Sequence, residues 1–212
     1  MKQRLALFDF DDTMYKGNSI VVFIFEMVKK GFLPSLGMLR LLWNTLRWKL
    51  GSITTEEVKS FSLHPLLKLT PGARQDFCRQ FTQSRLVPYL YADAVAAMER
   101  HALHGDLILL VSASPEIYLQ YLSEVLPVNG VLGTQTDEEM NILQNLVLEE
   151  KVRRIRQWLN QRGIDVDWSG SSAYGDSAND LPMLRMVGQP FLINPRHKIR
   201  ALGIDIPVQR WQ

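Results

Sequence analysis

Apolar positions follow two different rhythms along the chain. Between about residues 17 and 86 they recur at steps of three and four, which is typical of amphipathic helices. On both sides of that stretch, short runs that are apolar at nearly every position alternate with helical patterns. Such runs, of which residues 5–8 and 107–111 are the clearest, are typical of strands buried on both faces of a parallel sheet. The alternation predicts an α/β fold.

Within residues 17–86 the sequence predicts four helices and no strand. Glycines after the first two helical patterns are stop signals, and Thr54 with Glu57 forms a capping box that opens the third. Thr70 followed by Pro71 supplies an N-cap and a first-turn proline for the fourth. These helices are expected over 18–31, 34–51, 54 onward and 70 to about 85.

The rest of the chain reads as alternating strands and helices. Strands are expected over 5–8, 106–111, 128–133, 172–175 and 191–193, and helices over 93–104, 114–125, 149–162 and 179–187. Since the first strand belongs with the later ones, the helical stretch is an insertion between them. We expect residues 1–16 and 87–212 to form a three-layer, doubly wound parallel sheet, with residues 17–86 as a small inserted helical domain.

Composition narrows the class of protein without identifying it. The chain of 212 residues is 46% hydrophobic and 22% charged, like an ordinary globular protein, and its net charge of +2 does not indicate a nucleic-acid partner. No apolar run is long enough for a membrane-spanning helix, and acids interrupt the first apolar run too early for a signal peptide. The single cysteine, Cys78, fits a reducing compartment. We expect a cytoplasmic protein.

The second helical pattern carries both apolar and basic residues. Arg40, Arg47 and Lys49 accompany Trp43 and Trp48 there. We expect its apolar stripe to pack on the other inserted helices and its cations to be solvated. The alternative is peripheral contact with a membrane surface, which amphipathic helices rich in Lys, Arg and Trp can make. The leucines of that stripe are Leu36, Leu39, Leu42, Leu46 and Leu50.

An acidic cluster follows the first predicted strand. Asp9, Asp11 and Asp12 occupy three of four consecutive positions. Their mutual repulsion and loss of solvation would be offset by a bound cation, and carboxylates suit a hard ion such as Mg²⁺. The alternative interpretation is an acidic turn after an edge strand.

Three later segments carry polar groups at strand ends or helix starts, where open parallel sheets bind ligands. Ser112 follows a buried strand, Lys151 lies in the first turn of a predicted helix, and Asp176 follows the strand that ends at Gly175. Asp176 is placed to complete the metal site that begins at Asp9 and Asp11, with Asn179 and Asp180 beside it. The alternatives are a loop serine, a solvated lysine and an Asx-type turn.

The four segments together resemble the motifs of the haloacid dehalogenase-like (HAD) superfamily. Residues 9–13, Asp-Phe-Asp-Asp-Thr, resemble its first motif; Ser112 matches the second, Lys151 the third, and residues 175–180 the fourth. The sequences GDSANDLPML and SASPE, with a helical insertion between motifs one and two, are similar to the phosphoserine-phosphatase-like branch, subfamily IB. The resemblance covers essentially the whole chain.

This resemblance implies a mechanism and a role for each residue. Asp9 would be the nucleophile that forms an aspartyl-phosphate, and Asp11 the acid–base group. Mg²⁺ would be held by Asp9, the backbone carbonyl of Asp11, and Asp176. Ser112, Lys151 and Asn179 would bind the phosphate, Asp180 would support its neighbours from a second layer, and the helical insertion would act as a cap.

The implied activity is Mg²⁺-dependent hydrolysis of a small phosphorylated metabolite. Alternatives are a phosphotransferase or mutase on the same core, a phosphatidylglycerophosphate-type lipid phosphatase, and a non-catalytic phosphate-binding protein. Residues 15–19 contain no carboxylate to receive the amino group of phosphoserine, which disfavours that substrate.

Overall fold

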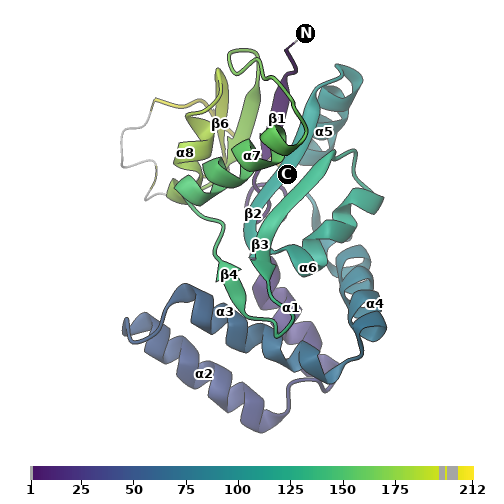
Figure 1. The fold of residues 1–212 in the computed structure, drawn as a ribbon, viewed down its shortest axis with the longest axis vertical. Coiled ribbons are helices and arrows are strands. Elements are labelled where there is room, and N and C mark those ends of the chain that lie inside the picture. The colour runs from purple at the N-terminus through teal and green to yellow at the C-terminus, as the bar shows by residue number, and fades with distance from the viewer. Residues whose placement is uncertain (1, 196–198, 200–204) are drawn as a thin grey trace.

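The computed structural model describes residues 2–195, 199 and 205–212. Its centre is a sheet in which seven strands are described, in the order β4-β3-β2-β1-β5-β6-β7 (Figure 1). Every neighbouring pair is parallel except β3 with β4. The strands are β1 Leu5–Phe8, β2 Leu107–Pro115, β3 Gly130–Thr136, β4 Ile142–Gln144, β5 Ser172–Gly175, β6 Gln189–Ile193 and β7 Val208–Gln209.

Strand β1 lies at the point where the sheet order reverses. All four of its residues are buried, and it is hydrogen-bonded to β2 on one side and β5 on the other. Phe8, the last residue of β1, is in register with Leu110 of β2 and Tyr174 of β5. Residues that follow these strands therefore meet at one edge of the sheet, beside the switch point where open α/β sheets bind ligands.

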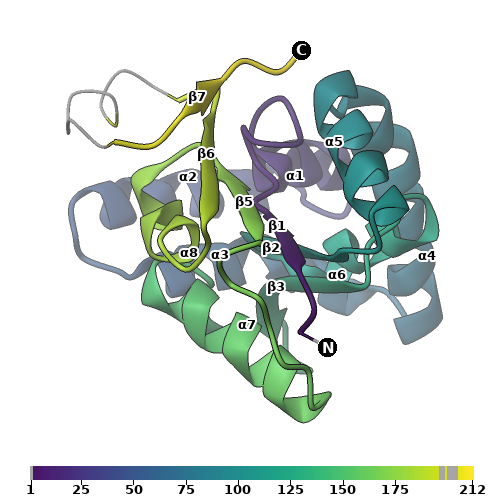
Figure 2. The same cartoon turned by 90° about the horizontal axis from the view of Figure 1, so that it is seen from above.

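Helices cover both faces of the sheet (Figure 2). One apolar cluster joins a sheet face to α5 Ala92–Leu103 and α6 Glu116–Leu119, and the other joins the opposite face to α7 Glu149–Gln161 and α8 Leu181–Leu184. The three-layer α/β architecture predicted from the sequence is confirmed. Among the described residues, no helix is long and apolar enough to cross a membrane.

The segment between β1 and α5 is helical, as expected. It contains α1 Ser19–Lys29, α2 Ser35–Lys49, α3 Thr55–Leu63 and α4 Pro71–Phe81, with a 3₁₀ turn over His64–Lys68 and a π turn over Thr82–Leu86. The predicted capping box opens α3: Thr54 Oγ1 accepts from the Glu57 N–H (3.1 Å), and the Glu57 carboxylate accepts from the Thr54 N–H (2.7 Å). Such reciprocal bonds satisfy the free N–H groups of a helix start.

The inserted helices share an apolar cluster with the sheet. Phe23 of α1 and Phe81 of α4 are buried and contact Tyr118 of α6, with ring centroids 4.8 and 5.3 Å away. Leu63 of α3 belongs to the same cluster as Phe8 of the sheet. The insertion therefore packs on the sheet without a separate apolar core.

The expected packing of the apolar stripe of α2 is wrong. Its six members are all exposed: Leu36 76%, Leu39 64%, Leu42 59%, Trp43 61%, Leu46 46% and Leu50 71%. Helix α2 instead buries Leu41 and Asn44, which lie on its opposite face. The periodicity located the apolar stripe correctly, but it does not show whether another element covers that stripe.

Smaller differences concern element boundaries. Strand β2 extends through Pro115, so Ser114 and Pro115 belong to the strand and do not begin a helix as predicted. The predicted helices over 114–125 and 179–187 are each a short α-helix joined to a 3₁₀ turn, Gln120–Glu124 and Ala178–Asp180 respectively. Strands β4 and β7 are not predicted, because strands of three and two residues are too short for a pattern to emerge.

Candidate active site

The turn that follows β1 fixes the first acidic residues. The Asp9 N–H donates to the Tyr174 carbonyl (2.9 Å), which continues the ladder between β1 and β5 by one residue. Asp12 adopts a left-handed backbone, with φ of +57°, and its N–H donates to the Gly17 carbonyl (3.1 Å). Asp12 therefore shapes the turn, since Asp tolerates this conformation better than most residues.

Three carboxylates meet beyond the ends of β1 and β5. Oxygens of Asp9, Asp176 and Asp180 all lie within 4.8 Å of one another, and all three residues are buried. A side-chain Cβ at Gly175 would lie 2.6 Å from the Asp180 Cβ, so this approach requires glycine. Three hard oxygen donors from two segments, one after β1 and one after β5, fit a divalent cation such as Mg²⁺. The structure brings Asp9 and Asp176 together as predicted, and the carboxylate of Asp180 joins them.

Lys151 lies inside this carboxylate cluster and is only 1% exposed. Its Nζ donates to Asp9 Oδ1 and Asp180 Oδ1, at 2.6 Å each, and to the Val111 carbonyl at 2.9 Å. The start of α7 is anchored there because the Leu148 N–H donates to the Asn179 carbonyl (3.0 Å). The alternative of a solvated lysine is therefore wrong.

Burial and neighbouring charges shift the pKa values of both Asp9 and Lys151. Burial and the charges of Asp180 and Asp176 raise the pKa of Asp9 well above its usual value, and Lys151 opposes that shift. Burial lowers the pKa of Lys151, but Asp180 and Asp9 more than offset this and leave its pKa raised. A bound cation would oppose the raised pKa of Asp9 and so stabilise its ionised form.

The Asp11 carboxylate turns away from the cluster, toward the inserted helices. It accepts from the Ser19 N–H (2.6 Å) at the start of α1 and from the Ser114 hydroxyl at the end of β2. Ser19 Oγ is also 2.9 Å from both Ser114 Oγ and the Tyr118 hydroxyl. Burial raises the pKa of Asp11, whereas the hydrogen bonds from Ser114 and Ser19 lower it. The sequence analysis did not single out Ser19 or Tyr118.

The remaining predicted residues differ in burial. Ser112 is 1% exposed, and its hydroxyl oxygen accepts from the Ser114 N–H (3.1 Å), where the register between β2 and β3 shifts. Asp180 is held by Ser177, whose N–H and hydroxyl both donate to Oδ2 (3.0 and 2.9 Å). Asn179 has an exposed side chain, so its predicted phosphate contact stays a prediction.

Lys59 of α3 is a second inward-facing lysine, which the sequence analysis missed. Its Nζ donates to the Ala113 carbonyl (2.8 Å) and to Asn145 Oδ1 (2.6 Å). Burial lowers the pKa of Lys59 to about 8, although Asp11 and Glu56 act against that shift. Nothing in the sequence marks Lys59, because a lysine three residues after a glutamate is typical of a solvated helix face.

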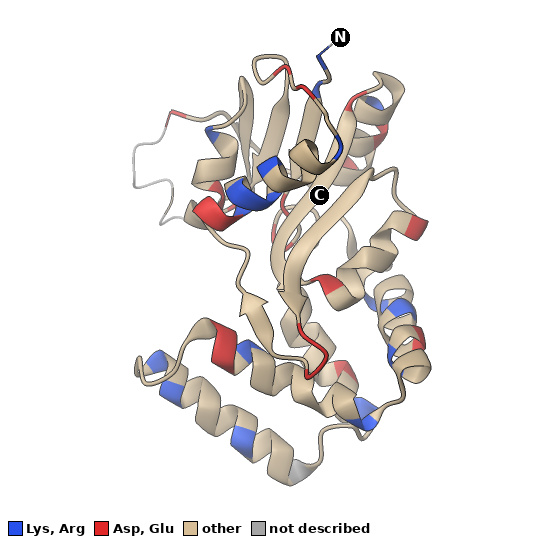
Figure 3. Ribbon diagram, viewed as in Figure 1, with Lys and Arg blue, Asp and Glu red and all other residues tan. Residues whose placement is uncertain are grey.

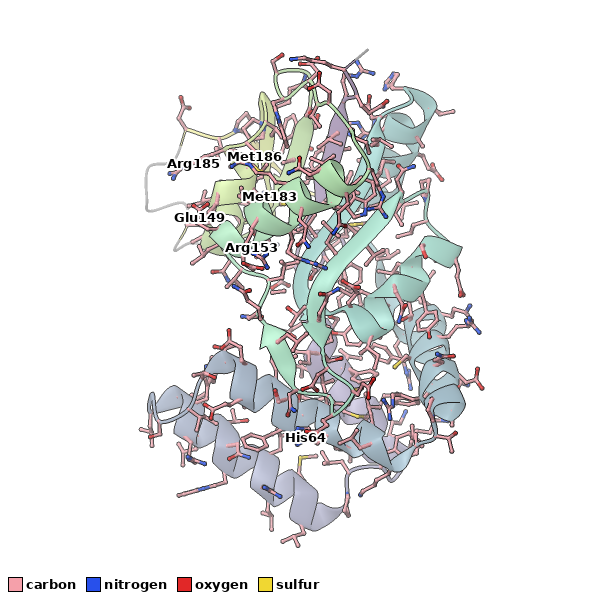
Figure 4. All side chains as sticks on the ribbon, in the orientation of Figure 1. His64, Glu149, Arg153, Met183, Arg185 and Met186 are labelled. Atoms are coloured by element: carbon pink, nitrogen blue, oxygen red, sulfur yellow. The ribbon has the colours of Figure 1, made fainter. Side chains whose placement is uncertain are left out.

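Asn145 connects this lysine to the sheet. Thr134 of β3 donates to the Ala113 carbonyl (2.6 Å) and lies 3.4 Å from Asn145 Oδ1. The segment around β4 also contacts α3 directly, since the Ile142 N–H donates to Ser60 Oγ (2.8 Å). Figure 4 labels His64, beyond the end of α3, where its Nε2 lies 3.0 Å from Asn141 Oδ1. Helix α3 is thereby fixed to the β4 segment and to the end of β2.

Comparison with known proteins agrees with this geometry. The sequence profile of the haloacid dehalogenase-like hydrolases matches residues 6–185. A histidinol-phosphatase of Neisseria meningitidis serogroup C is 26% identical, with 91% of each chain covered. The phosphoserine phosphatase SerB1 of Mycobacterium tuberculosis is 24% identical, over 93% of this chain and 67% of its own length.

Solved structures show the same fold. A protein of unknown function from Bordetella pertussis Tohama I superimposes with a TM-score of 0.86, at 26% identity, over 98% of both chains. A phospho-aspartyl intermediate analogue of phosphoserine phosphatase matches with a TM-score of 0.63 at 17% identity, over 100% of this chain and 96% of that one. The chain therefore belongs to the haloacid dehalogenase-like hydrolase family and is an enzyme related to phosphatases.

Proposed function

We propose that the chain is a Mg²⁺-dependent phosphomonoesterase that transfers the phosphoryl group of a small metabolite to Asp9 and then to water. The observation that carries this proposal is the hydrogen bond from buried Lys151 to Asp9, inside a cluster of three carboxylates at the sheet's switch point. A carboxylate nucleophile approaching an anionic phosphate needs neighbouring positive charge, and Lys151 supplies one such charge.

The donors present suit Mg²⁺. Asp9, Asp176 and the backbone carbonyl of Asp11 would hold the ion, while Asp180, whose two oxygens already accept from Lys151 and Ser177, would hold these groups in place. When bound, the ion would neutralise charge on the phosphate as the bond to phosphorus forms. The remaining steps belong to the protein's own side chains.

Phosphate binding would fall to Lys151, Ser112 and Asn179. Lys151 already has its charge fixed beside Asp9 by three hydrogen bonds, so little rearrangement would be needed as negative charge shifts between oxygens. Ser112 would donate its hydroxyl to a phosphate oxygen, and Asn179 would do the same from the exposed side of the cluster.

Asp11 would act as the acid–base group. Its carboxylate points away from the cluster and toward Ser19 and Ser114, next to the inserted helices. Protonated, it would give its proton to the leaving oxygen as the P–O bond breaks. The resulting carboxylate would then take a proton from the water that attacks the aspartyl-phosphate.

Residues 17–86 would form the cap that contacts the leaving group. Lys59 supports this role, because it reaches from α3 to the Ala113 carbonyl, between Ser112 and Ser114. A cation there would attract an anionic group of the substrate. The names of the relatives direct the first substrate tests to histidinol phosphate and phosphoserine, alongside sugar phosphates, nucleotides and a lipid phosphate.

Replacement of the nucleophile tests the proposal. Asp9→Asn should lower kcat on a generic aryl phosphate by about 10³-fold or more, since it removes the attacking carboxylate. Asp165→Asn, at an exposed acid away from the site, is the matched control and should keep full activity. Chelation of divalent ions should abolish wild-type activity, and added Mg²⁺ should restore it. Full hydrolysis by the Asp9→Asn variant would overturn the assignment.

A further inference from the structure

The outward face of α2 is a continuous apolar surface, which we call the α2 outer face. It consists of Leu36, Leu39, Leu42, Trp43, Leu46 and Leu50, each between 46% and 76% exposed. At 100° per residue these six positions fall within about one third of the helix circumference. The two residues that α2 buries, Leu41 and Asn44, lie on the other side. The helix thus turns its more apolar side outward, which is the reverse of ordinary packing.

Basic residues border this apolar face on both sides. Arg40 and Arg47 lie along one margin, and Lys49 lies along the other. Figure 3 shows basic positions and no acidic ones along α2, which is drawn at the end of the molecule away from the sheet.

The surrounding sequence is strongly asymmetric in charge. From residue 27 to residue 55 there is no Asp or Glu, but there are five cations: Lys29, Lys30, Arg40, Arg47 and Lys49. The rest of the chain keeps 19 of the 24 Lys and Arg residues against all 22 Asp and Glu. The slight positive charge of the whole chain therefore arises from this one segment, which also carries the α2 outer face.

We propose that the α2 outer face docks on the surface of an anionic lipid bilayer. The leucines would enter the boundary between headgroups and acyl chains, Trp43 would lie at headgroup level, and the bordering cations would contact lipid phosphates. The proposal concerns binding alone and does not depend on the proposed catalytic function.

A second copy of the chain fits this surface less well. A two-fold contact places the same patch of both copies face to face. Two rows of Arg40, Arg47 and Lys49 would then oppose each other with no acid on α2 to pair them. An anionic lipid surface instead complements both the apolar stripe and its charged margins.

Vesicle co-sedimentation tests this proposal with the full chain. The probes are vesicles of zwitterionic phosphatidylcholine, with and without anionic phosphatidylglycerol. The wild type should bind the anionic vesicles, and this binding should weaken as the salt concentration increases. Its affinity for the zwitterionic vesicles should be at least about tenfold lower. The first variant, Leu39→Ser with Trp43→Ser and Leu46→Ser, should lose binding to both. The second, Arg40→Gln with Arg47→Gln and Lys49→Gln, should lose the preference for anionic vesicles.

Matched controls distinguish binding through the α2 outer face from non-specific adsorption of the protein to vesicles. The apolar control changes three exposed residues elsewhere, Leu103→Ser, Val125→Ser and Leu143→Ser, and should bind like the wild type. The charge control, Lys2→Gln with Arg100→Gln and Arg156→Gln, should also keep its preference. All variants must retain the wild-type far-UV circular dichroism. Since the altered side chains are exposed or, for Arg47, half-buried, the variants are expected to fold.

Tryptophan emission gives a second readout. Binding should shift the emission to shorter wavelength, and Trp43→Phe should remove most of that shift while binding persists. Three outcomes would overturn the proposal: no binding of folded wild type to anionic vesicles at low salt, equal binding by wild type and the first variant, or a stable dimer by ultracentrifugation that the first variant dissociates.

Discussion

Helices α2 and α3 are neighbours in the insertion, but they differ in which kinds of side chain they expose and which they cover. Helix α2 exposes leucines and a tryptophan and holds its cations at the margins of that apolar stripe. Helix α3, which begins with Glu56 and Glu57, brings the ammonium group of Lys59 onto the end of β2. One helix thus has apolar groups in water, and the other has a partly buried ammonium group hydrogen-bonded to the sheet.

The contrast identifies two places where the burial of side chains differs from that of an ordinary amphipathic helix. A typical amphipathic helix would lower its free energy by covering Leu39 and leaving Lys59 in solvent. The exposed leucines and the partly buried lysine each lower the stability of the fold. Selection for stability alone would therefore remove both. Both exceptions are accordingly the places where we infer an interaction: a lipid surface for α2 and the substrate's anionic group for α3.

Truncation of a leucine on each helix should lower the free energy of unfolding only where that leucine is covered by other residues. Leu63→Ala, at a fully buried position of α3, should lower the free energy of unfolding by about 3 kcal/mol through lost burial and a new cavity. Leu39→Ala on α2 should change it by less than about 0.5 kcal/mol. Urea denaturation of both variants measures the difference. Similar losses would mean that α2 is covered in solution.

Removal of one lysine from each helix should show whether activity depends on the cation at the candidate site and not on one at the surface. Lys59→Met should lower kcat/KM by about 10²-fold, because it deletes a positive charge held at the site. Lys49→Met, the same change at an exposed position of α2, should stay within about twofold of the wild type. Steady-state kinetics on an aryl phosphate and on the best metabolite substrate provide the comparison. Unchanged kinetics for Lys59→Met would remove this residue from the site.

The depressed pKa of Lys59, about 8, predicts a pH signature. Between that value and the ordinary lysine pKa, the unfolded chain binds the proton that the folded chain has released, so the contribution of Lys59 to stability rises with pH. From about pH 7 to about pH 10, wild type should gain roughly 2 kcal/mol relative to Lys59→Met. Denaturation of both proteins across this range tests it. A difference that stays flat with pH would show that Lys59 is well solvated.

The smallest expected effect concerns the anchor of α3. Asn145→Ala removes the side-chain oxygen that accepts from Lys59, and it should cost about 1 kcal/mol of stability. Asn160→Ala, on the exposed surface of α7, is the control and should be neutral within about 0.5 kcal/mol. A larger loss of activity than of stability in Asn145→Ala would indicate that the hydrogen bond positions Lys59 for catalysis.

The sequence predicted the parts of the molecule that local chemistry determines. The fully apolar run of β1, the capping box at Thr54 and the acids after strands β1 and β5 are all visible in short windows, and all were found where expected. The family motifs taken together placed Lys151 at the site, and its burial there is a finding of the structure.

Long-range packing set the limits of that prediction. Lys59 and Asn145 are separated by 86 positions and meet only because the β4 segment contacts α3. The exposed face of α2 was misread for the same reason: the pattern in 34–51 defines an apolar stripe, but whether a neighbour covers it depends on how α1, α3 and α4 pack. Each of these features depends on tertiary contacts that the local sequence does not encode.

The central claim, that Asp9 carries the phosphoryl group, can be tested with the Asp11→Asn variant. An aryl phosphate with a good leaving group needs no proton from Asp11, whereas breakdown of the aspartyl-phosphate needs Asp11 as base. Acid-quenched Asp11→Asn should therefore gain the mass of one phosphoryl group, on the peptide that contains Asp9. The added mass should be absent from Asp9→Asn protein. Turnover of the aryl phosphate by Asp11→Asn, with no phosphoryl group on that peptide, would contradict the account.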